Sequence, residues 1–143
     1  MAESSQRADA PLPRAIALAR DALAEAPAGL LTDFDGTISP IVNDPAAARL
    51  VAGVEGALAA LAQRLAVVAV ITGRTPLDAR RMTGVPGILI AGNHGMEWLE
   101  PDESDPTTAS GAAGEVLPAL VAACDVVLAD PTEVAELLVA LSR

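Results

Sequence analysis

The segment Leu30-Leu31-Thr32-Asp33-Phe34-Asp35-Gly36-Thr37 joins a short apolar run to a turn that carries two carboxylates. The apolar residues predict a buried β-strand over residues 30–34, and the Asp-Gly-Thr sequence after Phe34 predicts the turn that ends it. One carboxylate then lies at the tip of the strand and the other lies on the following turn. Few structural needs place two acidic side chains in this way.

The two carboxylates, Asp33 and Asp35, suit phosphoryl transfer. One can attack a phosphorus atom and form an aspartyl-phosphate, while the other moves a proton to the leaving oxygen. The pair can also hold Mg²⁺, which prefers oxygen ligands. Gly36 permits the tight turn, and backbone amides there can receive phosphate oxygens. The alternative is an Asp-rich turn that only caps the strand, but the sequence on both sides favours the catalytic interpretation.

A second polar group follows the next predicted strand. Residues 66–71 are apolar and rich in valine, which predicts a strand buried on both faces, and Thr72, Gly73 and Arg74 come directly after it. The hydroxyl of Thr72 can donate to a phosphate oxygen, and Gly73 lets the backbone approach. Because this group comes one crossover after the carboxylates, we expect both groups at one site.

Helical and strand patterns alternate along the first two thirds of the chain. The predicted elements are helix 13–26, strand 30–34, helix 54–65, strand 66–71, helix 76–82 and strand 88–91. This order predicts an α/β fold with a Rossmann-like, partly parallel sheet and flanking helices. Its parallel strands end at one edge of the sheet, where such folds place their ligand sites.

The last third of the chain has a different character. Residues 100–114 are acidic and rich in Pro, Thr, Ser and Gly, which predicts a flexible linker. The elements expected beyond it are a helix over residues 115–123, a short strand over 126–129 and a final helix over 131–141. Asp130 is the expected N-cap of that last helix, with proline at its first position.

The composition excludes several classes of partner. The 143 residues carry 19 acidic and 9 basic side chains, for a net charge of −10, and every basic residue is an arginine. Nucleic acids and anionic lipids need clustered cations, so we expect neither as a partner. No apolar run approaches the roughly 18 residues of a membrane span, and the single Cys124 cannot form an intrachain disulfide. We therefore expect a cytoplasmic location.

Three blocks of sequence resemble a known family. They are Asp-Phe-Asp-Gly-Thr at 33–37 followed by Ser-Pro-Ile at 39–41, Ile-Thr-Gly-Arg at 71–74, and Ala-Gly-Asn-His-Gly-Met-Glu at 91–97. Together they resemble the haloacid dehalogenase superfamily and, within it, the trehalose-6-phosphate phosphatase family. The resemblance implies a hydrolase of trehalose biosynthesis that converts trehalose 6-phosphate and water to trehalose and phosphate, with Mg²⁺ as cofactor.

The resemblance also implies roles for the matching residues. Asp33 would be the nucleophile and a ligand of Mg²⁺, and Asp35 would be the general acid/base and bind Mg²⁺ through its backbone carbonyl. Thr72 would hold the transferring phosphoryl group, with Gly73 and Gly36 beside it. Such roles are plausible because phosphoryl transfer depends mostly on positioning and charge stabilisation.

Three further residues are candidates to contact the phosphorylated sugar, which is the expected partner. They are Arg74, His94 and Glu97. Arg74 can instead pair with the local carboxylates. His94 and Glu97 can instead make local hydrogen bonds, in a loop that in this family leads towards a cap over the substrate.

The chain departs from the family pattern. The family completes its phosphate site with a lysine and its metal site with a later acidic pair, and this chain contains no lysine and no Gly-Asp-Asp after residue 37. It also has no room for the cap. We therefore expect an incomplete haloacid dehalogenase-type core, a single truncated domain over residues 1–143. Its parts are an N-terminal catalytic half (1–99), the linker (100–114) and a C-terminal strand and helix (115–143).

Two functions of different class follow from these observations. The first is an Mg²⁺-dependent phosphomonoester hydrolase, and the alternative is a catalytically impaired remnant that acts as a small binding or structural module. A receiver-type signalling domain is disfavoured because its phosphoacceptor follows the third strand, where this chain has Ala91-Gly92. A partial sheet exposes apolar surface where absent strands would pack, so self-association is expected.

Overall fold

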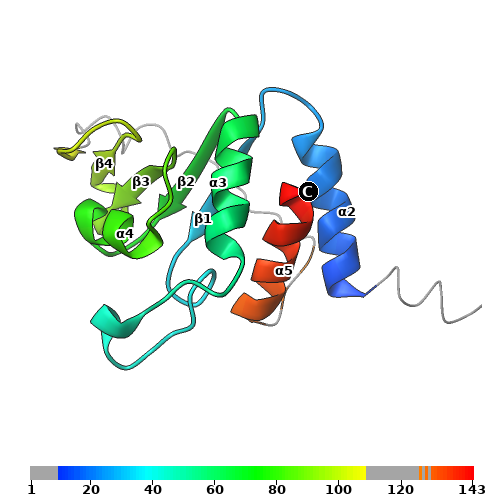
Figure 1. The fold of residues 1–143 in the computed structure, drawn as a ribbon, viewed down its shortest axis with the longest axis horizontal. Helices are drawn as coiled ribbons and strands as arrows, with labels where there is room; N and C mark the ends of the chain where they lie inside the picture. The colour runs from blue at the N-terminus through cyan, green and yellow to red at the C-terminus, as the bar shows by residue number, and fades with distance from the viewer. Residues whose placement is uncertain (1–9, 109–125, 127, 129) are drawn as a thin grey trace, which may run out of the picture.

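The alternating pattern of strands and helices produces one five-stranded sheet, in the order β1-β2-β3-β4-β5 (Figure 1). This computed structural model describes residues 10–108, 126, 128 and 130–143. The strands are β1 (Gly29–Asp33), β2 (Val67–Ile71), β3 (Leu89–Gly92), β4 (Glu97–Leu99) and β5 (Thr107–Thr108). The helices are α2 (Pro11–Leu23), η1 (Pro45–Ala47), α3 (Val54–Arg64), α4 (Pro76–Thr83), η2 (Asn93–Gly95) and α5 (Pro131–Ser142).

The first three strands form the parallel part of the sheet. β1 pairs with β2 and β2 pairs with β3, and the register aligns Asp33 with Ile71 and Ile71 with Ala91. The three strands therefore end level with one another, at the edge where the polar residues were expected. β4 and β5 join the sheet in antiparallel orientation, so the sheet is only partly parallel. The predicted α/β fold with a partly parallel sheet and flanking helices is therefore confirmed.

The hydrophobic core lies between one face of the sheet and the helices. Val68, Val70 and Ile90 point to this face and belong to one cluster with buried residues of α3, α4 and α5. Phe34, the residue after β1, is completely buried in the same cluster. In Figure 1, α3 lies in front of the sheet, with α5 beside α3 and α2 beside α5. Packing of the helices on one face thus fixes the strands that carry the site.

The opposite face of the sheet is more open. Leu31 is 65% exposed, Ile71 is 43% exposed and Val67 is 39% exposed, although all three lie in the parallel strands. The prediction that the second strand is buried on both faces is therefore correct only for its middle, residues 68–70. The ends of β2 are exposed because α3, α4 and α5 contribute to the core on the other face.

The helix ends follow the capping residues in the sequence. The side chain of Thr75 accepts a hydrogen bond from the backbone N–H of Asp78 at the start of α4, and Asp130 caps α5 by accepting from two backbone amides. The first helix, predicted to reach residue 26, ends at Leu23 instead. Pro27 accounts only for the loss of Ala26 from the helix, because proline disfavours helical backbone in the residue before it.

Two strands were absent from the sequence prediction. β4 has three residues and β5 has two, which is too short for an alternating pattern to be recognised. β5 also lies inside the segment predicted as a linker. The other predictions for residues 109–125, including the helix over 115–123, lie outside the described residues, as do two positions of the predicted strand 126–129.

No membrane-spanning helix is found in the described ranges, because none of their helices is long and apolar enough.

The final helix was predicted over residues 131–141 and is observed as α5, with Leu138 and Leu141 buried against the core. Val134 and Leu137 are half-buried at its margin. The apolar side chains of this helix therefore face the cluster shared with α3.

Candidate active site

Asp33 ends β1 at the carboxyl edge of the sheet, and its side chain is exposed. One carboxylate oxygen, Oδ1, accepts a hydrogen bond of 2.7 Å from the backbone N–H of Phe34. This bond restrains the carboxylate at the strand tip. Because Phe34 is anchored in the core, the position of Asp33 is tied to the packed interior rather than to a loop.

The turn after Phe34 depends on Gly36. This glycine has a φ of +80°, a backbone conformation that other residues rarely adopt, and its N–H donates to the carbonyl of Ser39 over 2.7 Å. The carbonyl of Phe34 accepts from the N–H groups of Ile38 and Ser39, which closes the turn. Gly36 is thus required for the shape of the turn that carries Asp35, while its contact with phosphate stays a prediction.

Asp35 forms a bidentate ion pair with Arg74. The Nε and Nη2 atoms of Arg74 donate to the two carboxylate oxygens over 2.9 and 2.7 Å. The guanidinium carbon also lies 5.2 Å from the centre of the Phe34 ring, in cation–π geometry. The pKa of Arg74 is raised because of its hydrogen bonds with Asp35, while partial burial acts in the opposite direction.

This ion pair connects the two predicted motifs directly. The side chain of Arg74 is 14% exposed and that of Asp35 is 41% exposed, so the pair is partly shielded from water. The local pairing considered as the alternative role of Arg74 is therefore observed. Contact of Arg74 with a sugar stays a prediction.

Thr72 lies just beyond the tip of β2 and is buried. Its backbone N–H donates to the carbonyl of Ala91 on β3 over 2.9 Å, which extends the ladder by one residue. Its hydroxyl oxygen accepts a hydrogen bond of 3.1 Å from the backbone N–H of Arg74. Among the described residues no acceptor for the hydroxyl hydrogen is found, so this hydrogen can be donated to a ligand.

The loop after β3 braces this turn through its backbone. Asn93 and His94 have positive φ values of 48° and 60°, which turns both amide N–H groups back towards β2. The N–H of Asn93 donates to the carbonyl of Arg74 over 2.8 Å, and that of His94 donates to the carbonyl of Thr72 over 2.9 Å. The side-chain amide of Asn93 donates to Glu97, so Glu97 takes part in the local bonding considered as its alternative role.

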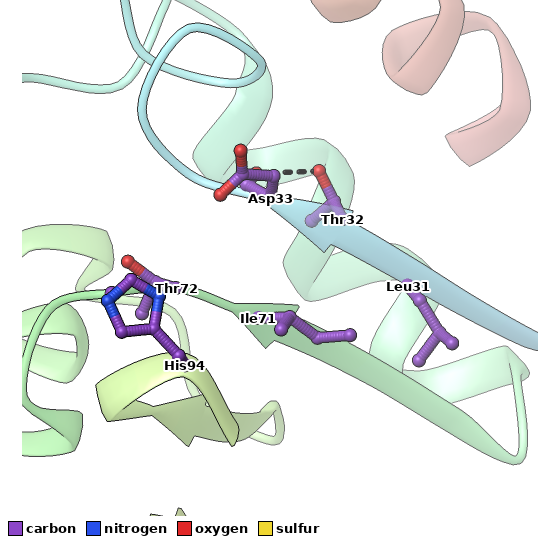
Figure 2. A pocket seen from close by; sticks show the side chains of 7 residues that line it. Leu31, Thr32, Asp33, Ile71, Thr72 and His94 are labelled. Carbon is purple, nitrogen blue, oxygen red and sulfur yellow. Dashed lines mark hydrogen bonds between the residues drawn. The ribbon is translucent and has the colours of Figure 1, made fainter. Parts of the chain in front are cut away.

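A pocket of about 310 Å³ lies at this edge of the sheet. Figure 2 shows Asp33 at the tip of β1 and Thr72 at the end of β2, with the ring of His94, from the loop after β3, beside Thr72. The pocket is lined by Leu31, Thr32, Asp33, Ile71, Thr72, Gly73 and His94. The structure thus brings together four of the predicted site residues, whereas Gly36, Asp35, Arg74 and Glu97 are outside the lining.

Sequence reasoning missed the walls of the pocket. Leu31 and Ile71 line it, and both lie on the sheet face opposite the core. Strand alternation provided a signal for Leu31, because residues two apart in a strand share a face and Leu31 therefore accompanies Asp33. The pocket combines an apolar wall with a carboxylate and a hydroxyl.

Close packing at Gly92 predicts a measurable cost of substitution. A Cβ atom at this position would lie 2.5 Å from Cδ of Pro76 and 2.6 Å from its backbone nitrogen. Gly92→Ala is therefore expected to reduce the free energy of unfolding by about 1–3 kcal/mol, measured by urea denaturation.

Gly56→Ala is the matched control for this substitution. Gly56 lies inside α3, and its added methyl group would have no neighbouring atom within 4 Å. The control is expected to be stabilised by about 0.5–1 kcal/mol through its helix propensity. An unchanged stability of Gly92→Ala would contradict the tight contact between β3 and the start of α4.

The parallel strands and the residues at their carboxyl ends define an α/β domain of the haloacid dehalogenase type. The family model described as trehalose-phosphatase matches residues 31–133. The chain therefore belongs to the trehalose-phosphatase family, as the three sequence blocks predicted.

Curated relatives are similar to part of this chain. It is similar to the trehalose-phosphate phosphatase of Mycobacterium avium (strain 104), with 51% identity over 84 residues, or 59% of this chain and 21% of that protein. The protein of the same name from Mycobacterium tuberculosis (strain ATCC 25618 / H37Rv) is 46% identical over 89 residues, or 62% of this chain and 22% of that protein. The chain thus spans about a fifth of the length of these relatives.

Solved structures agree with the fold. The C-terminal domain of C. albicans trehalose-6-phosphate phosphatase superposes with a TM-score of 0.58 and 26% identity, over 68% of this chain and 34% of that one. Trehalose-6-phosphate phosphatase of Aspergillus fumigatus gives a TM-score of 0.55 and 31% identity, over 65% and 35% of the two chains. The predicted haloacid dehalogenase-type core is confirmed by this similarity.

Proposed function

We propose that this chain hydrolyses a phosphorylated sugar, trehalose 6-phosphate, to trehalose and phosphate. The observation that carries the proposal is the shared pocket at the ends of β1 and β2, which contains the carboxylate of Asp33 and the hydroxyl of Thr72. Family membership supports the class of reaction. The names of the relatives that the chain resembles support the choice of sugar phosphate.

Asp33 is the proposed nucleophile. Its Oδ1 atom is occupied by the N–H of Phe34, so Oδ2 is the oxygen left to attack phosphorus. A bond forms between Oδ2 and phosphorus while the bond between phosphorus and the sugar oxygen breaks. Water then attacks the aspartyl-phosphate, which releases phosphate and returns the carboxylate. Thr72 would donate its hydroxyl hydrogen to one of the non-bridging oxygens, and Gly73 and Gly36 would let backbone amides approach the others.

Asp35 is the proposed general acid/base. It would give a proton to the leaving sugar oxygen and later accept one from the attacking water. In the structure both of its oxygens are bound by Arg74, so proton transfer requires one of them to be released. Until that step, the two hydrogen bonds from Arg74 keep the carboxylate of Asp35 in place beside β1. Arg74, His94 and Glu97 remain the candidates for contact with the sugar phosphate.

The oxygen donors beside the pocket fit Mg²⁺. The carboxylate of Asp33 is exposed, and in the described part of the chain no loop or turn hydrogen bond ends on the backbone carbonyl of Asp35. Those residues also contain no cluster of three or more His, Cys, Asp or Glu side chains. Two protein oxygens suffice in principle, because Mg²⁺ usually keeps several waters and also binds substrate phosphate. When bound, the ion supplies positive charge for the phosphoryl oxygens.

Removal of divalent cations is expected to abolish turnover. Phosphate release from trehalose 6-phosphate should fall by at least about 10²-fold in excess EDTA, because the phosphoryl charge then loses its principal compensation. Addition of MgCl₂ in excess of the chelator should restore the rate. Equal rates with and without the chelator would contradict the metal assignment while leaving the role of Asp33 open to its own test.

The assay that tests the proposal measures phosphate released by the purified chain from trehalose 6-phosphate and from an aryl phosphate, in the presence of MgCl₂. Release from the sugar phosphate at a rate well above the protein-free blank supports the hydrolase. A second candidate is a module that binds a phosphorylated sugar without turnover, and the absence of lysine from the sequence favours it. Binding of trehalose 6-phosphate without release of phosphate would select this alternative.

A further inference from the structure

His94 is the residue of the pocket lining that can carry a positive charge. The other six lining residues are neutral or, in the case of Asp33, negative. A phosphate dianion placed beside a carboxylate needs compensating charge, and the chain contains no lysine to provide it. The nearby Arg74 is already bound to Asp35 through two of its nitrogens.

We propose that the protonated imidazole of His94 binds a non-bridging oxygen of the phosphoryl group in this pocket. The inference rests on the proposed function, since it assigns the cation of the same site. The ligand class is a phosphate monoester or inorganic phosphate, held between Asp33, Thr72 and His94.

The ring of His94 is placed for this role by Gly73. A Cβ atom at Gly73 would lie 2.6 Å from Cε1, 3.1 Å from Nε2 and 3.3 Å from Nδ1 of His94. The edge of the ring that carries both nitrogens therefore rests against the residue that follows Thr72. The absence of a side chain at Gly73 is what allows this approach, and Figure 2 shows the ring next to the threonine.

A purely structural role does not account for the imidazole. The loop is braced by the backbone N–H of His94, which donates to Thr72, and by the neighbouring N–H of Asn93, which donates to Arg74. Neither bond needs a particular side chain at position 94. Among the described residues no hydrogen bond is made by either ring nitrogen, and the side chain is exposed. Both nitrogens are therefore free to donate to a ligand.

Several charged side chains lie on the segments around His94. They are Asp33 on β1, Asp35 on the turn after it, Arg74 after β2, Asp78 on α4 and Glu97 on its own segment. Asp35 pairs with Arg74 and Asp78 pairs with Arg81, whereas Glu97 accepts a hydrogen bond from the neutral amide of Asn93 and keeps its charge. Among the described residues neither Asp33 nor Glu97 has an ion-pair partner, so a phosphate dianion in this pocket would meet uncompensated negative charge.

Inorganic phosphate binding by the full chain tests the inference, measured by isothermal titration calorimetry with MgCl₂ at a fixed pH of about 6.5, where imidazole is readily protonated. His94→Gln is expected to weaken binding about tenfold, since it removes a charge-assisted hydrogen bond. His94→Lys should bind at least as tightly as the wild type. Gly73→Ala should also weaken binding, because its methyl group displaces the ring without removing it.

Arg14→Gln is the matched control, since it removes a positive charge from an exposed position on α2 and should leave the affinity unchanged. Equal phosphate affinity of the wild type and His94→Gln would overturn the inference, as would a wild type that binds no phosphate. Binding that depends on His94 without hydrolysis of trehalose 6-phosphate would contradict the hydrolase alone. Hydrolysis with phosphate affinity unaffected by His94→Gln would contradict the inference alone.

Discussion

Asp33→Asn is expected to lower the rate of phosphate release from trehalose 6-phosphate by about 10⁴-fold or more, as removal of a nucleophile does in other hydrolases. The amide cannot form the acyl-phosphate that the proposed reaction passes through. The substitution keeps an oxygen at Oδ1, so the 2.7 Å hydrogen bond from Phe34 can persist and the fold should be preserved. The rate is measured as inorganic phosphate released at saturating substrate with MgCl₂.

Asp44→Asn is the control with the same chemical change. Asp44 is exposed and caps the short helix η1 by accepting from the N–H of Ala46, a role that asparagine fills equally well. This variant should retain the activity of the wild type. Equal activity in both variants and the wild type would remove Asp33 from the mechanism and point to a contaminating phosphatase.

Phe34→Ala is expected to lower the free energy of unfolding by about 3–5 kcal/mol, the usual cost of truncating a buried phenylalanine. The ring is completely buried and forms the surface on which the guanidinium of Arg74 rests. A loss of this size is a large part of the 5–15 kcal/mol typical of a domain. Because Phe34 lies between the two carboxylates, the same cavity should also loosen the site.

Urea denaturation followed by circular dichroism measures this loss. Leu77→Ala is the control, since Leu77 lies on α4 with 52% of its side chain exposed and should cost less than about 1 kcal/mol. A similar small cost for Phe34→Ala would contradict the placement of this ring in the core. It would also weaken the argument that the core positions the site.

The sequence alone predicted the part of the site that depends on the sheet. Asp33 and Thr72 each follow an apolar strand, and parallel strands place their carboxyl ends at the same edge. The register aligns Asp33 with Ile71, so Thr72 lies one residue beyond that level and lines the same pocket. Periodicity and capping residues also located α3, α4 and α5 to within about two residues.

The remaining features depend on side-chain geometry that a linear pattern does not contain. The bidentate ion pair between Arg74 and Asp35 forms because the Gly36 turn and the turn after β2 bring residues 39 positions apart into contact. The position of the His94 ring depends on positive φ values at two consecutive residues that are not glycine. β4 and β5 escaped prediction because so few residues form each of them.

A covalent phosphoryl group on Asp33 is the most direct sign of the proposed reaction. The full chain is incubated with trehalose 6-phosphate and MgCl₂, quenched in acid, digested and examined by mass spectrometry. The proposed reaction predicts that the peptide containing Asp33 gains the mass of one phosphoryl group, and that Asp33→Asn shows no such gain. Phosphate release accompanied by a phosphoryl group on another residue, or no release and no adduct at all, would contradict it.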